Sequence, residues 1–221
     1  HGFEGLYTVE ISKAEALQRA GRAGRVREGT YILCSEIPLE SRTPFPEPEI
    51  RRLNLDSALL RLLHWKINPL EMPFFHSPPR SLLVKSLESL KVFGALDRSG
   101  RVTKDGEKMV RYPLSVRSSR LLLEASSGGR KVMESALGLI AVLETRGIVN
   151  QTYLGESFLP QGTYRSDPLN QLIFLKDRRS YKKLINFKKA ETAGEIVREL
   201  RERLKDSRLW PEEEKSPPNP E

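Results

Sequence analysis

The chain has 221 residues, of which 38% are hydrophobic, and its 37 basic and 29 acidic residues give a formal charge of +8. This length allows two to three small domains with buried cores, and the positive charge is consistent with a polyanionic partner. The single cysteine, Cys34, excludes an internal disulfide and a cysteine-based metal site. It also indicates a reducing, intracellular compartment, cytoplasmic or, in a eukaryote, nuclear. No apolar run approaches the roughly 20 residues that cross a bilayer, so we expect no membrane partner.

The N-terminal part of the chain predicts a small α/β piece. Residues 5–11 alternate loosely between apolar and polar side chains and predict a strand. Ser12 followed by Glu15 has the spacing of a capping box, so a helix is expected to begin there. The apolar segment 31–34 predicts a second strand, in which Cys34 would be a small buried residue.

An arginine-rich stretch occupies residues 18–25, with the sequence Gln-Arg-Ala-Gly-Arg-Ala-Gly-Arg. Arg19, Arg22 and Arg25 recur every three residues, which places them on nearly one side of a helix end, while the glycines allow close backbone approach. Planar guanidinium groups bind phosphate oxygens in pairs, so the stretch predicts a site for a compact, multiply charged anion. The alternative is a basic, glycine-broken helix terminus that only complements the helix dipole.

The middle of the chain predicts a winged helix at residues 49–115. Residues 38–48 contain four prolines and are incompatible with a helix or central strand, so they predict a linker. A first amphipathic helix carries Leu55, Leu59, Leu62 and Leu63. A second spans 81–93 and is closed by Gly94; a tight turn and a short helix capped by Thr103 follow. The alternative is an irregular helical array with a loop.

From residue 116 the chain predicts a helical bundle, which makes the whole fold mainly α. Apolar stripes at helical spacing recur up to residue 206, interrupted by a long loop at 151–166 that contains glycines and a proline. Asp167-Pro168 is a strong helix start. The acidic, proline-rich end at 207–221 predicts disorder.

The arginine-rich stretch resembles motif VI of superfamily 2 helicases, in the QRxGRAGR form of the DEAH-box (DEAH/RHA) family. Arg19 favours this family, because DEAD-box proteins usually begin the motif with His-Arg and Ski2-like helicases usually carry Met at the second position. Further similarity to the DEAH-box family lies in segments 11–14, 48–55, 94–97, 112–114 and 167–170.

The resemblance implies a domain order and a role for the arginines. It implies the tail of RecA-like domain 2 at 1–37, the linker at 38–48, a winged helix at 49–115, a helical ratchet (helicase-associated) domain at 116–206 and the tail at 207–221. It further implies that Gln18, Arg22 and Arg25 face the γ-phosphate of ATP across a cleft between two RecA-like domains. Arg22 and Arg25 would be the catalytic arginine fingers, which stabilise charge in the phosphoryl-transfer transition state.

Other parts that the family requires are missing from this sequence. There is no Walker loop and no Asp-Glu-x-His sequence, so ATP and Mg²⁺ would be bound mainly by a missing RecA1 domain, and we expect the fragment alone to be inactive. The chain begins at His1 rather than Met, and we expect it to be a piece of a longer protein. The OB-fold expected after the ratchet is also missing. His64 and His76 show no ligand pattern, so no metal site is predicted.

A basic segment near the end of the predicted bundle is the candidate nucleic-acid contact. Arg178, Arg179, Lys182 and Lys183 can neutralise phosphates, and Tyr181 among them can stack on a base. The alternative is a solvated helix face.

These observations favour the C-terminal part of an ATP-dependent DEAH-box RNA helicase, which couples ATP hydrolysis to movement along a single strand. The implied partners are single-stranded RNA, with DNA as the alternative, the RecA1 and RecA2 core of the same chain, and an activator protein. One alternative is a non-catalytic winged-helix module that binds nucleic acid or acts as a scaffold, although the helix at 81–93 is only lightly basic. Another is a DNA-directed superfamily 2 helicase, against which Arg19 argues.

Overall fold

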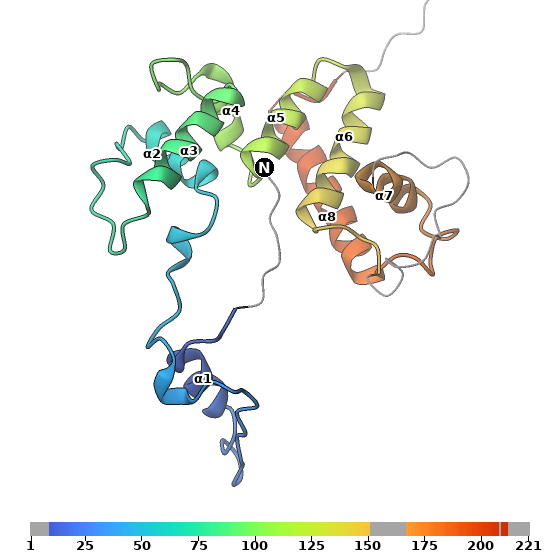
Figure 1. Ribbon diagram of the computed structural model, residues 1–221. Coiled ribbons are helices and arrows are strands. Elements are labelled where there is room, and N and C mark those ends of the chain that lie inside the picture. Colours follow the sequence, from blue (N-terminus) through green and yellow to red (C-terminus); the bar gives the residue numbers. More distant parts are fainter. Residues whose placement is uncertain (1–8, 151–166, 208, 212–221) are drawn as a thin grey trace, which may run out of the picture. The chain divides into compact units, whose positions relative to one another are not determined.

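The computed structural model describes residues 9–150, 167–207 and 209–211, and all regular elements in these ranges are helices (Figure 1). By compactness the chain divides into two units, His1–Asn54 with Pro73–Leu83, and Leu55–Met72 with Val84–Glu221. The prediction of a mainly α fold is therefore confirmed. The predicted loop at 151–166 and most of the predicted disordered tail lie outside the described residues.

The first unit is built around helix α1 (Lys13–Ala20). The predicted capping box is present: the amide of Glu15 donates to Ser12 Oγ at 3.2 Å, and the amide of Ser12 donates to Glu15 Oε2 at 2.8 Å. Two further amides of the first turn donate to the carbonyls of Thr43 and Pro44. Because a helix start leaves its first N–H groups without helical partners, these bonds fix α1 against the segment that follows the 3₁₀ helix η1 (Leu39–Ser41). A second 3₁₀ helix, η2, spans Glu49–Arg51.

The predicted strands are absent from the described part of the first unit, and that prediction was wrong there. Residues 31–34 form no strand, and Cys34 is exposed rather than buried. Residues 9–11 are also not in a strand, while residues 5–8 lie outside the described ranges. A strand is stabilised by pairing its backbone groups with a neighbour, and the described residues of this unit provide no such neighbour.

The second unit contains α2 (Asp56–His64), α4 (Lys104–Val110) and the part of α3 (Arg80–Val92) from Val84 onward, with a short hairpin between α3 and α4. Gly94 ends α3 with a φ of +70°, as expected for a glycine after a helix. Leu96 and Val102 then form an antiparallel bridge across the predicted turn. Thr103 caps α4 by accepting from the amide of Gly106 at 3.0 Å, and its hydroxyl donates to the carbonyl of Gly94 at 2.6 Å.

The rest of the second unit is a bundle in which α6 (Gly129–Glu144) packs against α5 (Val116–Ala125), α7 (Asp167–Lys176) and α8 (Phe187–Asp206) (Figure 1). The predicted stripe of α6 forms the centre of the core, with Met133, Leu137 and Ile140 fully buried. Burial of each such side chain stabilises the fold by about 1.5–3 kcal/mol. The bundle is therefore stabilised mainly through α6.

The turn between α7 and α8 is fixed to the chain that follows α6. The amide of Asn186 donates to the carbonyl of Ile148 at 2.7 Å, and the amide of Asn150 donates to the carbonyl of Leu184 at 2.8 Å. The side chain of Gln171 on α7 accepts from the buried amide of Ile148 at 2.6 Å. These bonds position the basic segment at 178–183.

Candidate phosphate and nucleic-acid sites

The arginine-rich stretch lies at the C-terminal end of α1 and in the turn after it. Gln18, Arg19, Arg22 and Arg25 are all exposed, and none of them forms an ion pair with an acidic side chain among the described residues. Arg25 Nε donates to the carbonyl of Gly21 at 3.1 Å, which orients its side chain across the turn. Arg22 and Arg25 therefore present guanidinium groups that form no ion pair with a carboxylate of the described residues, an arrangement suited to a polyphosphate.

The basic segment lies in a turn after α7 rather than on a helix face. Arg179, Lys182 and Lys183 are exposed, whereas Arg178 is half-buried and its Nε donates to the carbonyl of Leu175 at 3.3 Å. The ring of Tyr181 is also half-buried. It packs on Phe174 with centroids 4.6 Å apart, so it is part of the bundle core as well as a neighbour of the basic side chains.

A groove with a volume of about 570 Å³ runs between α6, α7 and α8, and Arg178 is one of its lining residues. Leu172, Leu175 and Val197 line it with apolar surface. Its charged lining residues are Lys176, Arg178, Arg198, Arg201, Glu134 and Glu191. Cations thus outnumber carboxylates, which favours an anionic ligand.

Two of the cations on α8 that line the groove, Arg198 and Arg201, were not predicted as part of a site. Arg198 and Arg201 are three residues apart, which places them on one helix face, and this spacing was the only sequence signal for them. Their proximity to Arg178 depends on Gly194, where a Cβ would be 2.6 Å from Arg178 Nη2. A contact between residues so far apart in the chain could not be derived from local spacing.

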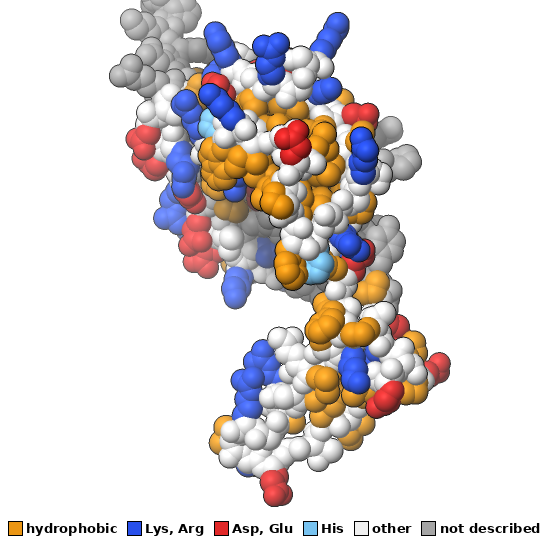
Figure 2. Space-filling model, turned by 90° about the vertical axis from the view of Figure 1, so that its left-hand side faces the viewer, with side chains coloured by type: hydrophobic (Ala, Val, Ile, Leu, Met, Phe, Trp, Pro, Cys, Tyr) orange, Lys and Arg blue, Asp and Glu red, His pale blue; other side chains and the backbone are white. Residues whose placement is uncertain are grey.

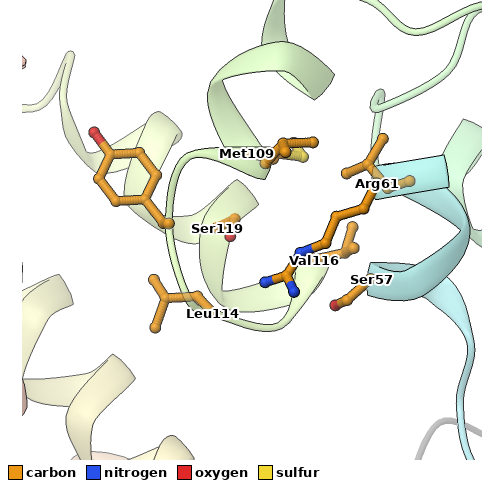
Figure 3. Close-up of a pocket in the computed structure, with 9 residues that line it drawn as sticks. Ser57, Arg61, Met109, Leu114, Val116 and Ser119 are labelled. Atoms are coloured by element: carbon orange, nitrogen blue, oxygen red, sulfur yellow. The ribbon is translucent and has the colours of Figure 1, made fainter. Parts of the chain in front are cut away.

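A second cavity lies between α2, α4 and α5 (Figure 3). Its volume is about 10 Å³, and its lining includes Ser57, Arg61, Met109, Val116 and Ser119. A space of this size accommodates about one water molecule, so it is not a ligand site.

Figure 2 shows hydrophobic side chains gathered on one face of the larger body, with Lys and Arg around them. The segment after α2 contributes exposed apolar residues, with 64% of Trp65 and 54% of Leu70 accessible to solvent.

Within the described ranges, no group of three or more His, Cys, Asp or Glu side chains is arranged to hold a metal ion. Among the same residues, no helix has the length and apolar character that a membrane span needs.

Comparison with known proteins shows which proteins this chain resembles. The winged-helix model of the helicase-associated domain (HA2) matches residues 86–114. Over 147 residues the chain is 40% identical to the ATP-dependent RNA helicase DHX33 of Drosophila melanogaster, covering 65% of this chain and 21% of the relative. Over 150 residues it is 35% identical to the pre-mRNA-splicing factor ATP-dependent RNA helicase prp22 of Schizosaccharomyces pombe, covering 66% of this chain and 13% of the relative. Over these residues the chain is similar to DEAH-box RNA helicases.

A solved structure has a similar fold. The structure resembles the DExH-box NTPase HrpB of E. coli with a TM-score of 0.56 and 24% sequence identity, covering 87% of this chain and 21% of HrpB. The chain thus spans about a fifth or less of the length of these relatives. The HA2 match falls inside the winged helix predicted at 49–115, while the exact domain boundaries stay predictions.

Proposed function

We propose that the full-length protein is an ATP-dependent RNA helicase of the DEAH-box type, of which this chain supplies the C-terminal part. The observation that carries the proposal is the presence, in one chain, of an exposed motif VI-like arginine stretch and an HA2 winged helix. The relatives DHX33 and prp22 are both named ATP-dependent RNA helicases, which supports the same activity here. Coupling of ATP hydrolysis to movement along single-stranded RNA is part of the proposal.

In this proposal Gln18, Arg22 and Arg25 contact the γ-phosphate of ATP. Their exposed side chains, free of acidic partners among the described residues, fit a polyphosphate. The described residues offer no cluster for Mg²⁺, so the metal and most of the nucleotide would be held by the RecA1 domain of the full protein. This chain alone would consequently not hydrolyse ATP.

For RNA, the proposal assigns backbone contacts to Arg178, Arg179, Lys182 and Lys183. Three of these cations are exposed in one turn, and Arg178 connects that turn to the groove along α8. Because the ring of Tyr181 is partly buried against Phe174, it offers less surface for stacking on an RNA base than an exposed ring would. Phosphate contacts of this kind give affinity without sequence specificity.

The arginine roles are tested by substitution in the full-length protein. Arg22→Ala and Arg25→Ala are each expected to lower the RNA-stimulated kcat for ATP by about 10²-fold or more, because each removes positive charge that stabilises the transition state. Arg27→Ala, a neighbouring exposed arginine outside the motif, is the matched control and should retain near-normal kcat. Unchanged hydrolysis by Arg25→Ala would remove the proposed role.

The RNA contacts are tested by salt dependence. Arg179→Ala, Lys182→Ala and Lys183→Ala should each weaken single-stranded RNA binding and lower the slope of log K against log salt by about 0.7 per lost phosphate contact. Lys205→Ala, which removes a cation already paired with Glu202, is the control. An unchanged slope in all three variants would contradict the assignment. The same assay with single-stranded DNA distinguishes an RNA-directed from a DNA-directed helicase, since only RNA carries the 2′-hydroxyl.

A further inference from the structure

A buried arginine lies at the base of the arginine-rich stretch. The side chain of Arg42, which directly follows η1, has only 2% of its surface exposed. A fully buried guanidinium is costly unless its donors are paired. The contacts that compensate this cost show what Arg42 holds together.

The guanidinium of Arg42 joins two segments that are distant in sequence. Nη1 donates to Glu10 Oε2 at 3.0 Å and to the carbonyl of Ile11 at 2.8 Å. Nη2 donates to Ser35 Oγ at 2.5 Å and to the carbonyl of Ile37 at 3.1 Å. Glu10 and Ile11 precede α1, whereas Ser35 and Ile37 follow the arginine-rich stretch. One side chain therefore binds both ends of the segment 12–34.

The residues next to Arg42 hold the helix itself. The carbonyls of Thr43 and Pro44 accept from the amides of Lys13 and Ala14 at 2.8 and 3.0 Å. Ser12, 1% exposed, caps the same turn. The start of α1 is thus anchored on residues 42–44, and α1 carries Gln18 and leads directly into Arg22 and Arg25.

We propose that Arg42 is a positioning residue for motif VI. It closes the base of the segment 12–34, so that the arginines of the stretch extend from a fixed support. The role requires a planar group with several donors in fixed directions, which lysine lacks. Arg42 makes no contact with the phosphates in this scheme; it acts through the position of Arg22 and Arg25. The inference rests on the proposed function of those arginines.

The test compares Arg42→Met, Arg42→Lys and Glu10→Gln in the full-length protein. Arg42→Met is expected to lower the RNA-stimulated kcat by about 10- to 100-fold, as a misplacement of order 1 Å does, with the KM for ATP changed by less than about twofold. Arg42→Lys should recover only a minor part of this loss. Glu10→Gln should have little effect, because the Glu10 side chain is 63% exposed and an amide oxygen still accepts from Nη1.

A mutant cycle in which Arg22 and Arg25 are both replaced by alanine separates positioning from a general loss of structure. If Arg42 acts through motif VI, then Arg42→Met in the background that carries both Arg22→Ala and Arg25→Ala lowers kcat by less than about twofold further. If the two losses multiply, Arg42 acts elsewhere and the proposal is wrong. It is equally wrong if Arg42→Met leaves kcat unchanged while Arg25→Ala lowers it.

Amide hydrogen exchange provides a measurement that does not depend on activity. In Arg42→Met the amides of residues 13–25 should exchange about tenfold faster or more, with those of α6 unchanged. If Arg25→Ala does not affect hydrolysis, the proposed function of the arginines is wrong. If the amides of residues 13–25 exchange at an unchanged rate in Arg42→Met, the proposed positioning role of Arg42 is wrong, whatever the result for hydrolysis. Should Arg42→Met not fold, Arg42→Lys, which keeps the charge and the aliphatic stem, is used for the cycle and the exchange measurement.

Discussion

The guanidinium of Arg178 lies directly against Gly194 of α8, where a Cβ would be 2.6 Å from its Nη2 atom. The absence of a side chain at this one helical position lets an arginine from the turn after α7 lie along α8. The close approach connects the basic turn with Arg198 and Arg201 in a single groove. Gly194 thus lowers the local stability of the 20-residue helix α8, but it makes room for the side chain of Arg178.

We predict that Gly194→Ala separates these two effects. Alanine is favoured over glycine in a helix by about 1 kcal/mol, and the colliding atom is the mobile end of an arginine, so thermal stability should be maintained or slightly raised. The guanidinium of Arg178 should move away, and RNA affinity should fall by about as much as in Arg178→Ala. Thermal denaturation and RNA titration measure the two effects.

The control for this prediction is Gly194→Ala in an Arg178→Ala background. With the arginine side chain removed, the alanine should raise stability without a further change in RNA affinity. A further loss of affinity in this background would show that position 194 acts on RNA independently of Arg178.

A second glycine, Gly106 in α4, is predicted to be intolerant of substitution. A Cβ there would be 2.2 Å from the backbone carbonyl oxygen of Ala95 and 2.9 Å from Val102 Cγ1. Because a backbone atom cannot move aside without distorting the hairpin, Gly106→Ala should reduce the free energy of unfolding by about 2–3 kcal/mol in urea denaturation. Gly100→Ala is the comparison: its φ of +86° gives a strain of about 1 kcal/mol, with no neighbour within 4 Å. Equal effects of the two changes would contradict the steric argument.

The buried carboxylate of Asp56 is predicted to stabilise the pair of α2 and α3. Ser89 Oγ donates to Asp56 Oδ2 at 2.6 Å, and Asp56 is the first residue of α2, where a negative charge is favourable. Ser89→Ala should therefore cost about 1 kcal/mol of unfolding free energy. Asp56→Asn should cost about as much. In an Asp56→Ala background the cost of Ser89→Ala should fall, and an undiminished cost would show that the two side chains are not coupled.

The capping box of α1 is predicted to make this helix sensitive to acid. Two hydrogen bonds from Ser12 to the Glu15 carboxylate lower the pKa of Glu15 below its ordinary value of 4.5. The bond from the Ser12 amide has the larger effect, and the bond from the Ser12 hydroxyl has the second largest. Because the folded state favours the charged form, the stabilising contribution is complete above pH 4.5 and is lost as the pH falls through the lowered pKa. NMR titration of the Glu15 carboxyl should give a midpoint below 4.5. Glu15→Gln, which keeps an acceptor but does not titrate, should remove this part of the acid response, and a midpoint at or above 4.5 would refute the prediction.

The local features of this protein were predictable from short stretches of sequence. The capping box at Ser12 and Glu15, the glycine that ends α3 and the Thr103 cap of α4 were all expected, and the structure contains each of them. Each depends on hydrogen bonds or backbone angles within about four residues. The apolar stripe of α6 was equally clear, because helical periodicity shows which face is buried even when its partner is unknown.

The sequence did not indicate contacts between distant segments. The expected strand at 31–34 failed because a strand depends on a neighbour that the segment itself does not contain. The groove along α8 and the bonds of Arg42 also escaped prediction, since both bring together residues from separate segments. Residue types and spacings therefore revealed the arginine motif and the helices. Only the tertiary structure decided which side chains support that motif and which cations share a groove, because such contacts depend on how the chain packs and not on its local pattern.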